Sequence, residues 1–397
     1  MTTSGDEKDQ VITLLLLLSR TTFTEEERVQ AEKCCRTLTA WKLFADLAIR
    51  HGVAALAWQN ITDLGLTGAV PEQERNLLEN IRFKTIARVS YITSEAFEAV
   101  AELEKEGIRA LLLKGLALEH SVYGSRGLRQ MSDADLLVSP EDALRARDIL
   151  IKAGFISMPM KSSLYRHIIL DLGNHLPELH RNGISVDLHH RLFGPEGSAL
   201  VRRALDKPET ISVADETYHV LPPGIALLGL VNHIYKHEVK GEFQLRLYTD
   251  ICLLVKKHEG KIFDGNLLSD ASQAGIQGGL RTVLTILNKF YGIDIPPEYK
   301  AREGTEQEKV AAFRDKLFDP GQAKPQSRKE LFLENLKSLR GIRRKLIFIT
   351  GDLFPSIEFM KNRYGCSTAL SALLYYPHRF GKILWVINPI MSKYLRR

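Results

Sequence analysis

The chain has 397 residues, of which 44% are hydrophobic and 26% are charged. This composition is close to that of an average soluble globular protein, so it supports a sizeable core and excludes wholesale disorder, collagen and coiled coil. The length predicts roughly two to three domains. The 54 Lys and Arg residues exceed the 48 Asp and Glu residues by six, a mild excess that suits an anionic ligand without indicating a nucleic-acid surface.

The cysteines indicate the cellular compartment, and the apolar runs indicate whether the chain carries a signal peptide or contacts a membrane. Four cysteines without a Cys-x-x-Cys spacing argue against a disulfide scaffold and favour a reducing, cytoplasmic compartment. The apolar run 11–18 follows an acidic segment rather than a basic one, so we interpret it as a helix and not as a signal peptide. The apolar run 383–387 is too short to span a membrane, although the basic end after it leaves weak contact with a membrane surface open.

Both ends of the chain follow a helical pattern. Apolar residues recur at spacings of three and four over 25–57 and 72–104, with charged residues between them. From about residue 222 onward the same kind of pattern returns. We therefore expect an N-terminal helical region over 1–104 and a C-terminal helical domain over 221–397.

The central residues, 105–220, alternate between strand and helix patterns. Short apolar runs over 108–113 and 131–138 are typical of buried strands. A helical pattern follows each of them, over 116–123 and 139–153. This order predicts an α/β domain between the two helical parts.

A β-hairpin is predicted over 175–190. Asn182-Gly183 lies between alternating residues, and this pair is the strongest short hairpin sequence because both turn positions need a positive φ. With these two residues as the loop, Glu178 would lie opposite Asp187 on the polar side of the hairpin. Opposed like charges destabilise a sheet, so a cation nearby would account for this pair.

Two carboxylates lie two positions apart in the second predicted strand. Side chains alternate along a strand, so Asp133 and Asp135 share one face with Cα atoms ~6.6 Å apart, while Ala134 and Leu136 point into the core. Their oxygens can share metal ions about 3.5–4 Å apart, the spacing of two-metal phosphoryl chemistry. Asp-x-Asp alone is a weak pattern, and a solvated strand end is the alternative interpretation.

These segments together carry a family resemblance. Residues 111–115, 126–129, 131–138 and 186–189 resemble the uncharacterised nucleotidyltransferase family, a divergent branch of the DNA polymerase beta-like superfamily. The likeness covers about 105–195. It implies an α/β (α+β) fold with a small mixed-sheet catalytic core flanked by helical domains. It also implies transfer of a nucleoside monophosphate from an NTP such as ATP to a hydroxyl-type acceptor, with release of pyrophosphate.

The resemblance also implies roles for particular residues. Two Mg²⁺ ions would be held by three catalytic carboxylates: Asp133, Asp135 and Asp187. The nucleotide would be bound by four residues: Lys114, Gly115, Arg126 and Arg129. The hairpin register, and not the resemblance, places Glu178 and His189 beside Asp187 as candidate supporting residues. The turn departs from the wider superfamily at Leu116, where a serine is usual, so the serine hydroxyl contact with phosphate is missing.

A group of histidines and two residue pairs with helical spacing allow other interpretations. Histidines crowd the segment 167–190, but no His-Glu-x-x-His occurs, which argues against a zinc hydrolase. His233 and His237 are four apart, and so are Arg246 and Asp250. On a helix each pair shares a face, so we interpret the first as a packed helix surface and the second as an ion pair.

Two other function classes stay open beside the enzyme. A catalytically silent module of the same fold could bind a nucleotide or a partner, although three bare acids on one face favour catalysis. Nucleic-acid binding is not expected, because no basic stripe with interleaved aromatic residues occurs. The acceptor cannot be read from the sequence: a small molecule, a sugar, a peptide and a protein all remain open.

Overall fold

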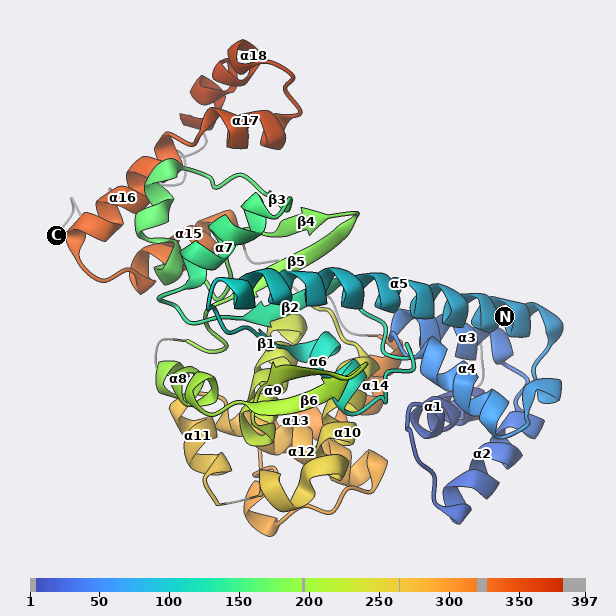
Figure 1. The fold of residues 1–397 in the computed structure, drawn as a ribbon. Helices are drawn as coiled ribbons and strands as arrows, with labels where there is room; N and C mark the ends of the chain where they lie inside the picture. The colour runs from blue at the N-terminus through green and yellow to red at the C-terminus, as the bar shows by residue number, and fades with distance from the viewer. Residues whose placement is uncertain (1–4, 195–196, 264, 320–326, 381–397) are drawn as a thin grey trace.

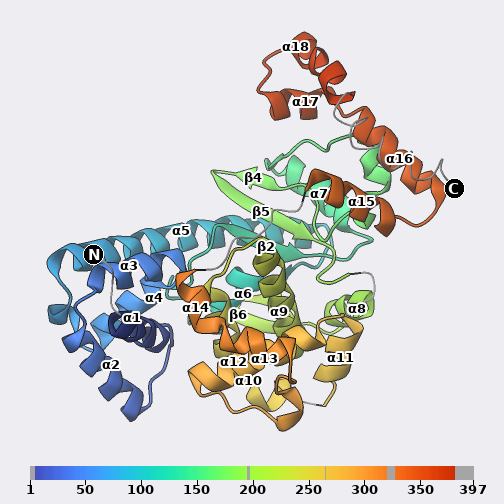
Figure 2. The ribbon, with the colours of Figure 1, turned by 180° about the vertical axis from the view of Figure 1, so that it is seen from behind.

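The computed structural model describes residues 5–194, 197–263, 265–319 and 327–380 (Figure 1). A mixed β-sheet lies at the centre and helices surround it, which confirms the predicted α/β class with flanking helices (Figures 1 and 2). Among these residues, none of the helices combines the length and the apolar character that a membrane crossing requires. The apolar run 383–387 lies outside the described residues.

The helices before the sheet follow the predicted pattern. They are α1 (Gly5–Leu18), α2 (Glu25–Thr37), α3 (Trp41–Arg50), α4 (Ala54–Asp63) and α5 (Glu72–Lys105). The apolar run 11–18 is helical and largely buried in α1, as predicted. Thr24 and Glu27 form a capping box that begins α2, which satisfies two backbone N–H groups at that helix end. The long α5 crosses the sheet and extends beyond it to α3 and α4 (Figure 1).

The sheet contains the strands β1 (Leu111–Leu112), β2 (Asp133–Leu137), β3 (Ile156–Ser157), β4 (Leu179–Arg181), β5 (Ile184–His189), β6 (Glu209–Val213) and β7 (Glu216–Val220). Their spatial order is β3-β4-β5-β2-β1-β7-β6. β2 runs parallel to β5, and β1 runs parallel to β7, whereas the other neighbours are antiparallel. The sheet is therefore mixed, as the family resemblance implied.

The predicted hairpin forms with the predicted register. Asn182 and Gly183 both have positive φ, 51° and 75°, and they join β4 to β5. Leu179 pairs with Val186 across the hairpin. β4 begins at Leu179, so Glu178 lies one residue before the strand.

The remaining helices cover the two faces and the ends of the sheet. They are α6 (Lys114–Ser121), α7 (Ala143–Lys152), α8 (Ser198–Asp206), α9 (Pro223–Val239), α10 (Leu245–Ile262), α11 (Leu267–Gln273), α12 (Gln277–Tyr291), α13 (Thr305–Ala311), α14 (Phe313–Phe318), α15 (Arg328–Ser338), α16 (Ile342–Leu353), α17 (Ile357–Tyr364) and α18 (Ala369–Leu373). α9 to α14 gather on the side of the sheet opposite α5 (Figures 1 and 2).

The alternation of β2 and β5 decides which side chains face which helices. Ala134, Leu136, Val186 and Leu188 are fully buried in a core that also contains residues of α5 and α7. Burying each leucine contributes about 1.5–3 kcal/mol, and a slip of one residue would expose all of them, so the register is strongly fixed. The polar residues between them therefore face the other side, where α6 lies.

The larger core joins parts of the chain that the sequence assigned to separate domains. It contains buried residues of α1 to α5, of β1 and of α9 to α14 in one cluster. α5 ends at Lys105 and β7 ends at Val220, close to the limits expected for the central domain. The division into 1–104, 105–220 and 221–397 stays a prediction.

Candidate functional site

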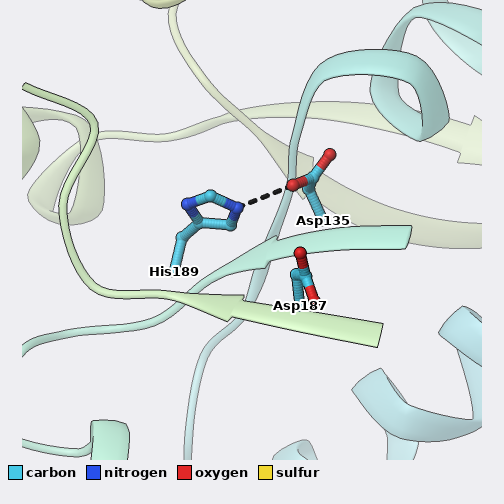
Figure 3. Close-up of side chains that lie close together, drawn as sticks. All are labelled: Asp135, Asp187 and His189. Carbon is cyan, nitrogen blue, oxygen red and sulfur yellow. Dashed lines mark hydrogen bonds and ion pairs between the residues drawn. The ribbon is translucent and has the colours of Figure 1, made fainter. Parts of the chain in front are cut away.

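Neighbouring strands bring two carboxylates and an imidazole together. Asp135 of β2 pairs in register with Asp187 of β5, and His189 follows two residues later on the same face. Each of the three offers one ligand atom, and these atoms lie within 4.8 Å of one another (Figure 3). We call this set the carboxylate–histidine cluster.

Asp135 is almost fully buried and receives two contacts on one oxygen. Lys114 Nζ and His189 Nε2 each lie 2.6 Å from Asp135 Oδ1. Burial alone would raise the pKa of Asp135. The ammonium of Lys114 and the hydrogen bond with His189 more than offset this effect, so its pKa lies well below the usual range. Asp135 is therefore a permanent negative charge.

Asp187 has the opposite character. Its Oδ1 is buried and has no hydrogen-bond partner within the described residues. Burial, and then the negative charge of Asp135, raise the pKa of Asp187 to about 6. Two adjacent carboxylates with pKa values pushed apart are typical of sites that bind cations or transfer protons.

The donor set fits a divalent cation. Carboxylate oxygens suit Mg²⁺ and Mn²⁺, and a neutral imidazole suits Mn²⁺ and Zn²⁺ better than Mg²⁺. Burial lowers the pKa of His189, which favours the neutral ring. Its Nε2 donates to Asp135 Oδ1 in this structure, so a cation would replace that hydrogen bond when it binds this nitrogen. The orphaned Oδ1 of Asp187 is the kind of buried acceptor that a cation would satisfy.

Lys114 lies at a strained turn beside this cluster. It is the first residue of α6, separated from β1 by Leu113 alone, and its φ of 45° is in the left-handed region that residues other than glycine rarely adopt. Such strain costs of order 1–3 kcal/mol and persists where the surroundings enforce it. Here it directs the ammonium onto Asp135, 3.4 Å from His189 Nε2.

Arg129 has a structural partner away from the cluster. Its guanidinium donates to both oxygens of Asp250 in α10, with Nη2 2.7 Å from Oδ2, and both side chains are buried. The same guanidinium covers Gly115, where a Cβ would collide with Nη1. The predicted pairing of Asp250 with Arg246 is wrong, because Arg129 takes the carboxylate and Arg246 donates to Gln130 O instead.

The other predicted residues lie around the cluster without joining it. Asp133 shares the face of Asp135 but lies at the start of β2, where its carboxylate accepts from Ser132 Oγ. Arg126 forms an exposed ion pair with Asp63. Glu178 lies 3.4 Å from His180 Nε2, on the surface. The structure thus brings Lys114, Asp135, Asp187 and His189 together, and it does not bring Asp133, Arg126, Arg129 or Glu178 into contact with them.

A cavity of about 370 Å³ opens beside the cluster. It reaches His189 of the cluster and the neighbouring Lys114, and it continues between the strands β1, β6 and β7 and the helices α9 and α10. Its size is that of a small-molecule pocket. Five of its lining residues carry a positive charge: Lys114, Arg191, Lys236, Lys240 and Lys257. Glu209 is its one carboxylate, and this group pairs with Lys261.

Sequence reasoning missed the contribution of α9 to this cavity. His233, Lys236, His237 and Lys240 line it at spacings of three and four, so they occupy one helical face. His233 lines the same cavity as Lys114 and His189, which places this helix next to the cluster. Burial, and then the positive charge of Lys114, lower the pKa of His233 to about 2. The sequence led us to expect His233 and His237 on a packed helix surface, whereas in the structure both line the cavity. The cationic spacing along 233–240 was the available signal.

Comparison with known proteins agrees with this arrangement. The sheet, the helices on its two faces and the acidic cluster on adjacent strands define an α/β protein with a candidate metal site. The family model described as uncharacterised nucleotidyltransferase matches residues 37–292, well over half of the chain, and the protein belongs to this family. No curated protein matches the chain.

Proposed function

We propose that the protein is a metal-dependent nucleotidyltransferase that transfers a nucleoside monophosphate from an NTP to an acceptor oxygen. The observation that carries the proposal is the carboxylate–histidine cluster on adjacent strands in a member of a nucleotidyltransferase family. The cluster would hold at least one divalent cation, Mg²⁺ or Mn²⁺. The pair of Mg²⁺ ions expected from the sequence stays a prediction, because Asp133 lies outside the cluster.

The chemistry follows from the positions of the residues. The acceptor oxygen attacks the α-phosphorus and forms a new P–O bond, while the bond to the oxygen bridging the α- and β-phosphorus breaks and pyrophosphate leaves with the electron pair. Asp187, two residues before His189 on the same face of β5, would take the acceptor's proton once the acceptor oxygen reaches the cluster. Asp135 and His189 fix the geometry. A bound divalent cation supplies charge stabilisation for the phosphoryl oxygens.

The cavity suggests which groups hold the outer phosphates. Lys236 and Lys240 line it near Lys114, and neither has a carboxylate partner within the described residues. The pKa of Lys236 is lowered, first because the cavity wall reduces its hydration and then by the charges of Lys114 and Lys240. Three like charges that repel one another would be stabilised by a polyphosphate. We therefore propose these lysines, in place of Arg126 and Arg129, as the β- and γ-phosphate contacts.

A silent binding module remains the second candidate. The observation that favours it is the ion pair of Lys114 with Asp135, which already neutralises one carboxylate. Such a module would bind a nucleotide or a partner without turnover. The cytoplasmic location, and a small molecule, sugar, peptide or protein as acceptor, belong to the proposal. Nucleic acid as a ligand and a weak contact with a membrane surface are alternatives that carry no observation within the described residues.

The test of the function is a screen with each of the four NTPs. Pyrophosphate release and nucleotide binding are measured with Mg²⁺, with Mn²⁺ and with excess chelator. We expect binding of at least one NTP that needs the divalent cation, and slow hydrolytic pyrophosphate release even without the acceptor. Binding without any release over hours would favour the silent module. Absence of NTP binding under every condition would contradict both.

Removing the two lysines tests the phosphate contacts. The double variant Lys236→Ala/Lys240→Ala should weaken binding of inorganic tripolyphosphate by about 10- to 100-fold, since a hydrogen bond to a charged group contributes about 1.5–3 kcal/mol when desolvated and less at an exposed site. Calorimetry at two salt concentrations measures this loss and its ionic-strength dependence. Lys256→Ala, on the exposed side of α10, is the matched control. Equal affinity of the double variant and the control would remove these lysines from the site.

A further inference from the structure

The two ends of the cavity differ in the charge of the side chains that line them. Lys114, Lys236 and Lys240 form the cationic end beside the cluster, whereas the part away from the cluster is lined mainly by aliphatic side chains. The walls of this part come from the strands β1, β6 and β7 and from the helices α6, α9 and α10. Most of the side chains that line it are aliphatic: Leu112, Leu118, Ile211, Val220, Leu221, Ala226, Leu230 and Leu254. No phenylalanine, tyrosine or tryptophan lines the cavity within the described residues. We call this part the aliphatic arm.

A glycine widens the arm from the helix side. Gly229 lies inside α9 and lines the cavity, and a Cβ built on it would meet no atom within 4 Å. Glycine inside a helix is less favourable than alanine because it loses more backbone freedom on folding. The backbone here has ordinary helical φ, so the absent side chain creates space and relieves no strain.

The arm is a poor match for the nucleotide. A nucleobase has hydrogen-bonding edges that cost free energy when they are buried without partners. The polar side chains of the arm are Ser121, Thr210, Glu209, Lys257 and His258. Lys257 donates to Ser121 O and Glu209 pairs with Lys261, so these two groups already have partners. Among the described residues, no phenylalanine, tyrosine or tryptophan ring lines the arm for stacking. With the triphosphate placed on Lys114, Lys236 and Lys240, the arm remains for the second substrate.

We propose that the aliphatic arm is the acceptor pocket, and that the acceptor is a small molecule with an aliphatic body and one nucleophilic oxygen. This inference rests on the proposed function and narrows its acceptor class. The aliphatic body would lie between β1, β7 and α9, and its oxygen would point along the cavity toward Lys114, His189 and Asp187. The cavity volume of about 370 Å³, which must also admit the phosphates, favours a small acceptor over a long polymer.

The test uses sodium decanoate as an aliphatic probe with a terminal oxygen group. We expect calorimetric binding with a negative heat-capacity change, the mark of apolar burial, and a rise in Tm. The variant Gly229→Leu fills the arm and should weaken decanoate binding by at least about 10-fold, an effect of about 1.4 kcal/mol. Gly260→Leu is the matched control, because Gly260 is exposed in α10 with open space around it. Its affinity should equal that of the wild type.

Further measurements separate this proposal from the function itself. Gly229→Ala should raise Tm and bind decanoate more weakly than the wild type, which keeps the test valid if the leucine variant does not fold. Inorganic tripolyphosphate and Mn²⁺ should bind Gly229→Leu as they bind the wild type, so failure of the phosphate or metal site is seen independently. Equal decanoate affinity in the glycine variants and the wild type would overturn the acceptor pocket. Displacement of decanoate by adenosine would overturn it too, because the arm would then hold the nucleoside.

Discussion

The variant Asp135→Asn should lose divalent-cation binding and reduce nucleotidyl transfer by about 10²–10³-fold or more, the cost of removing one preorganised electrostatic contact. Asparagine keeps the shape of the side chain and removes the charge. Lys114 Nζ and His189 Nε2 both contact Asp135 Oδ1, so the change also frees Lys114 and His189 from their shared partner. Metal binding is measured with Mn²⁺ by electron paramagnetic resonance, and transfer by pyrophosphate release.

The matched control for this variant is Asp133→Asn. Asp133 is on the same strand and the same face, but it contacts Ser132 and lies outside the carboxylate–histidine cluster. We expect less than a 10-fold loss of Mn²⁺ affinity for this control, because a carboxylate beyond direct contact acts through screened charge alone. An equal loss in both variants would show that Asp133 is a ligand of equal weight, which is the two-ion arrangement that the family resemblance implied.

The central part of the sheet could be predicted because local chemistry and tertiary packing agree there. Asn182 and Gly183 adopt the positive φ values that a two-residue hairpin needs, and this turn fixed the register of β4 and β5. The alternation of Asp135 and Leu136 likewise identified the buried and the polar face of β2. The parallel pairing of β2 with β5 is a long-range contact, and here the family resemblance contributed what the pattern could not.

The second hairpin and the cationic end of the cavity could not be predicted for a physical reason. β6 and β7 are joined by Ala214 and Asp215, which have positive φ values of 48° and 66° although neither is glycine or asparagine. Asp215 is a residue type that tolerates positive φ, but Ala214 is not, so this turn has a weaker sequence signal than Asn182-Gly183. Similarly, Lys236 and Lys240 look like an ordinary solvated helix face until the fold brings Lys114 beside them.

Arg129 shows that the sequence can single out a residue without showing which partner it contacts. Its position just before β2 indicated a phosphate contact, and its partner Asp250 is 121 residues later in the chain. The partner determines what an arginine can do, because a guanidinium held by a buried carboxylate is not free for a phosphate. The sequence thus identified Arg129 but not its partner Asp250, and the predicted nucleotide contact of Arg129 stays a prediction.

The variant Asp250→Ala should lower the free energy of unfolding by about 3–5 kcal/mol, because it leaves the buried charge of Arg129 without a partner. Asp250 is fully buried and also accepts a hydrogen bond from Tyr123 Oη at 2.9 Å, so the tyrosine hydroxyl loses its partner as well. Urea unfolding measures the change. The double variant Arg129→Met/Asp250→Leu should recover most of the loss, since apolar side chains of similar size remove both charges together.

The exposed ion pair of Arg126 with Asp63 supplies the control for this effect. Its atoms lie 3.1 Å apart, similar to the buried pair, but about half of each side chain is exposed to solvent. Exposed pairs contribute about 0–1 kcal/mol, so Asp63→Ala should change stability by less than ~1 kcal/mol. Comparable losses for Asp63→Ala and Asp250→Ala would mean that burial is not the source of the effect. A large loss confined to Asp250→Ala would establish that the buried Arg129–Asp250 pair holds α10 against the segment before β2.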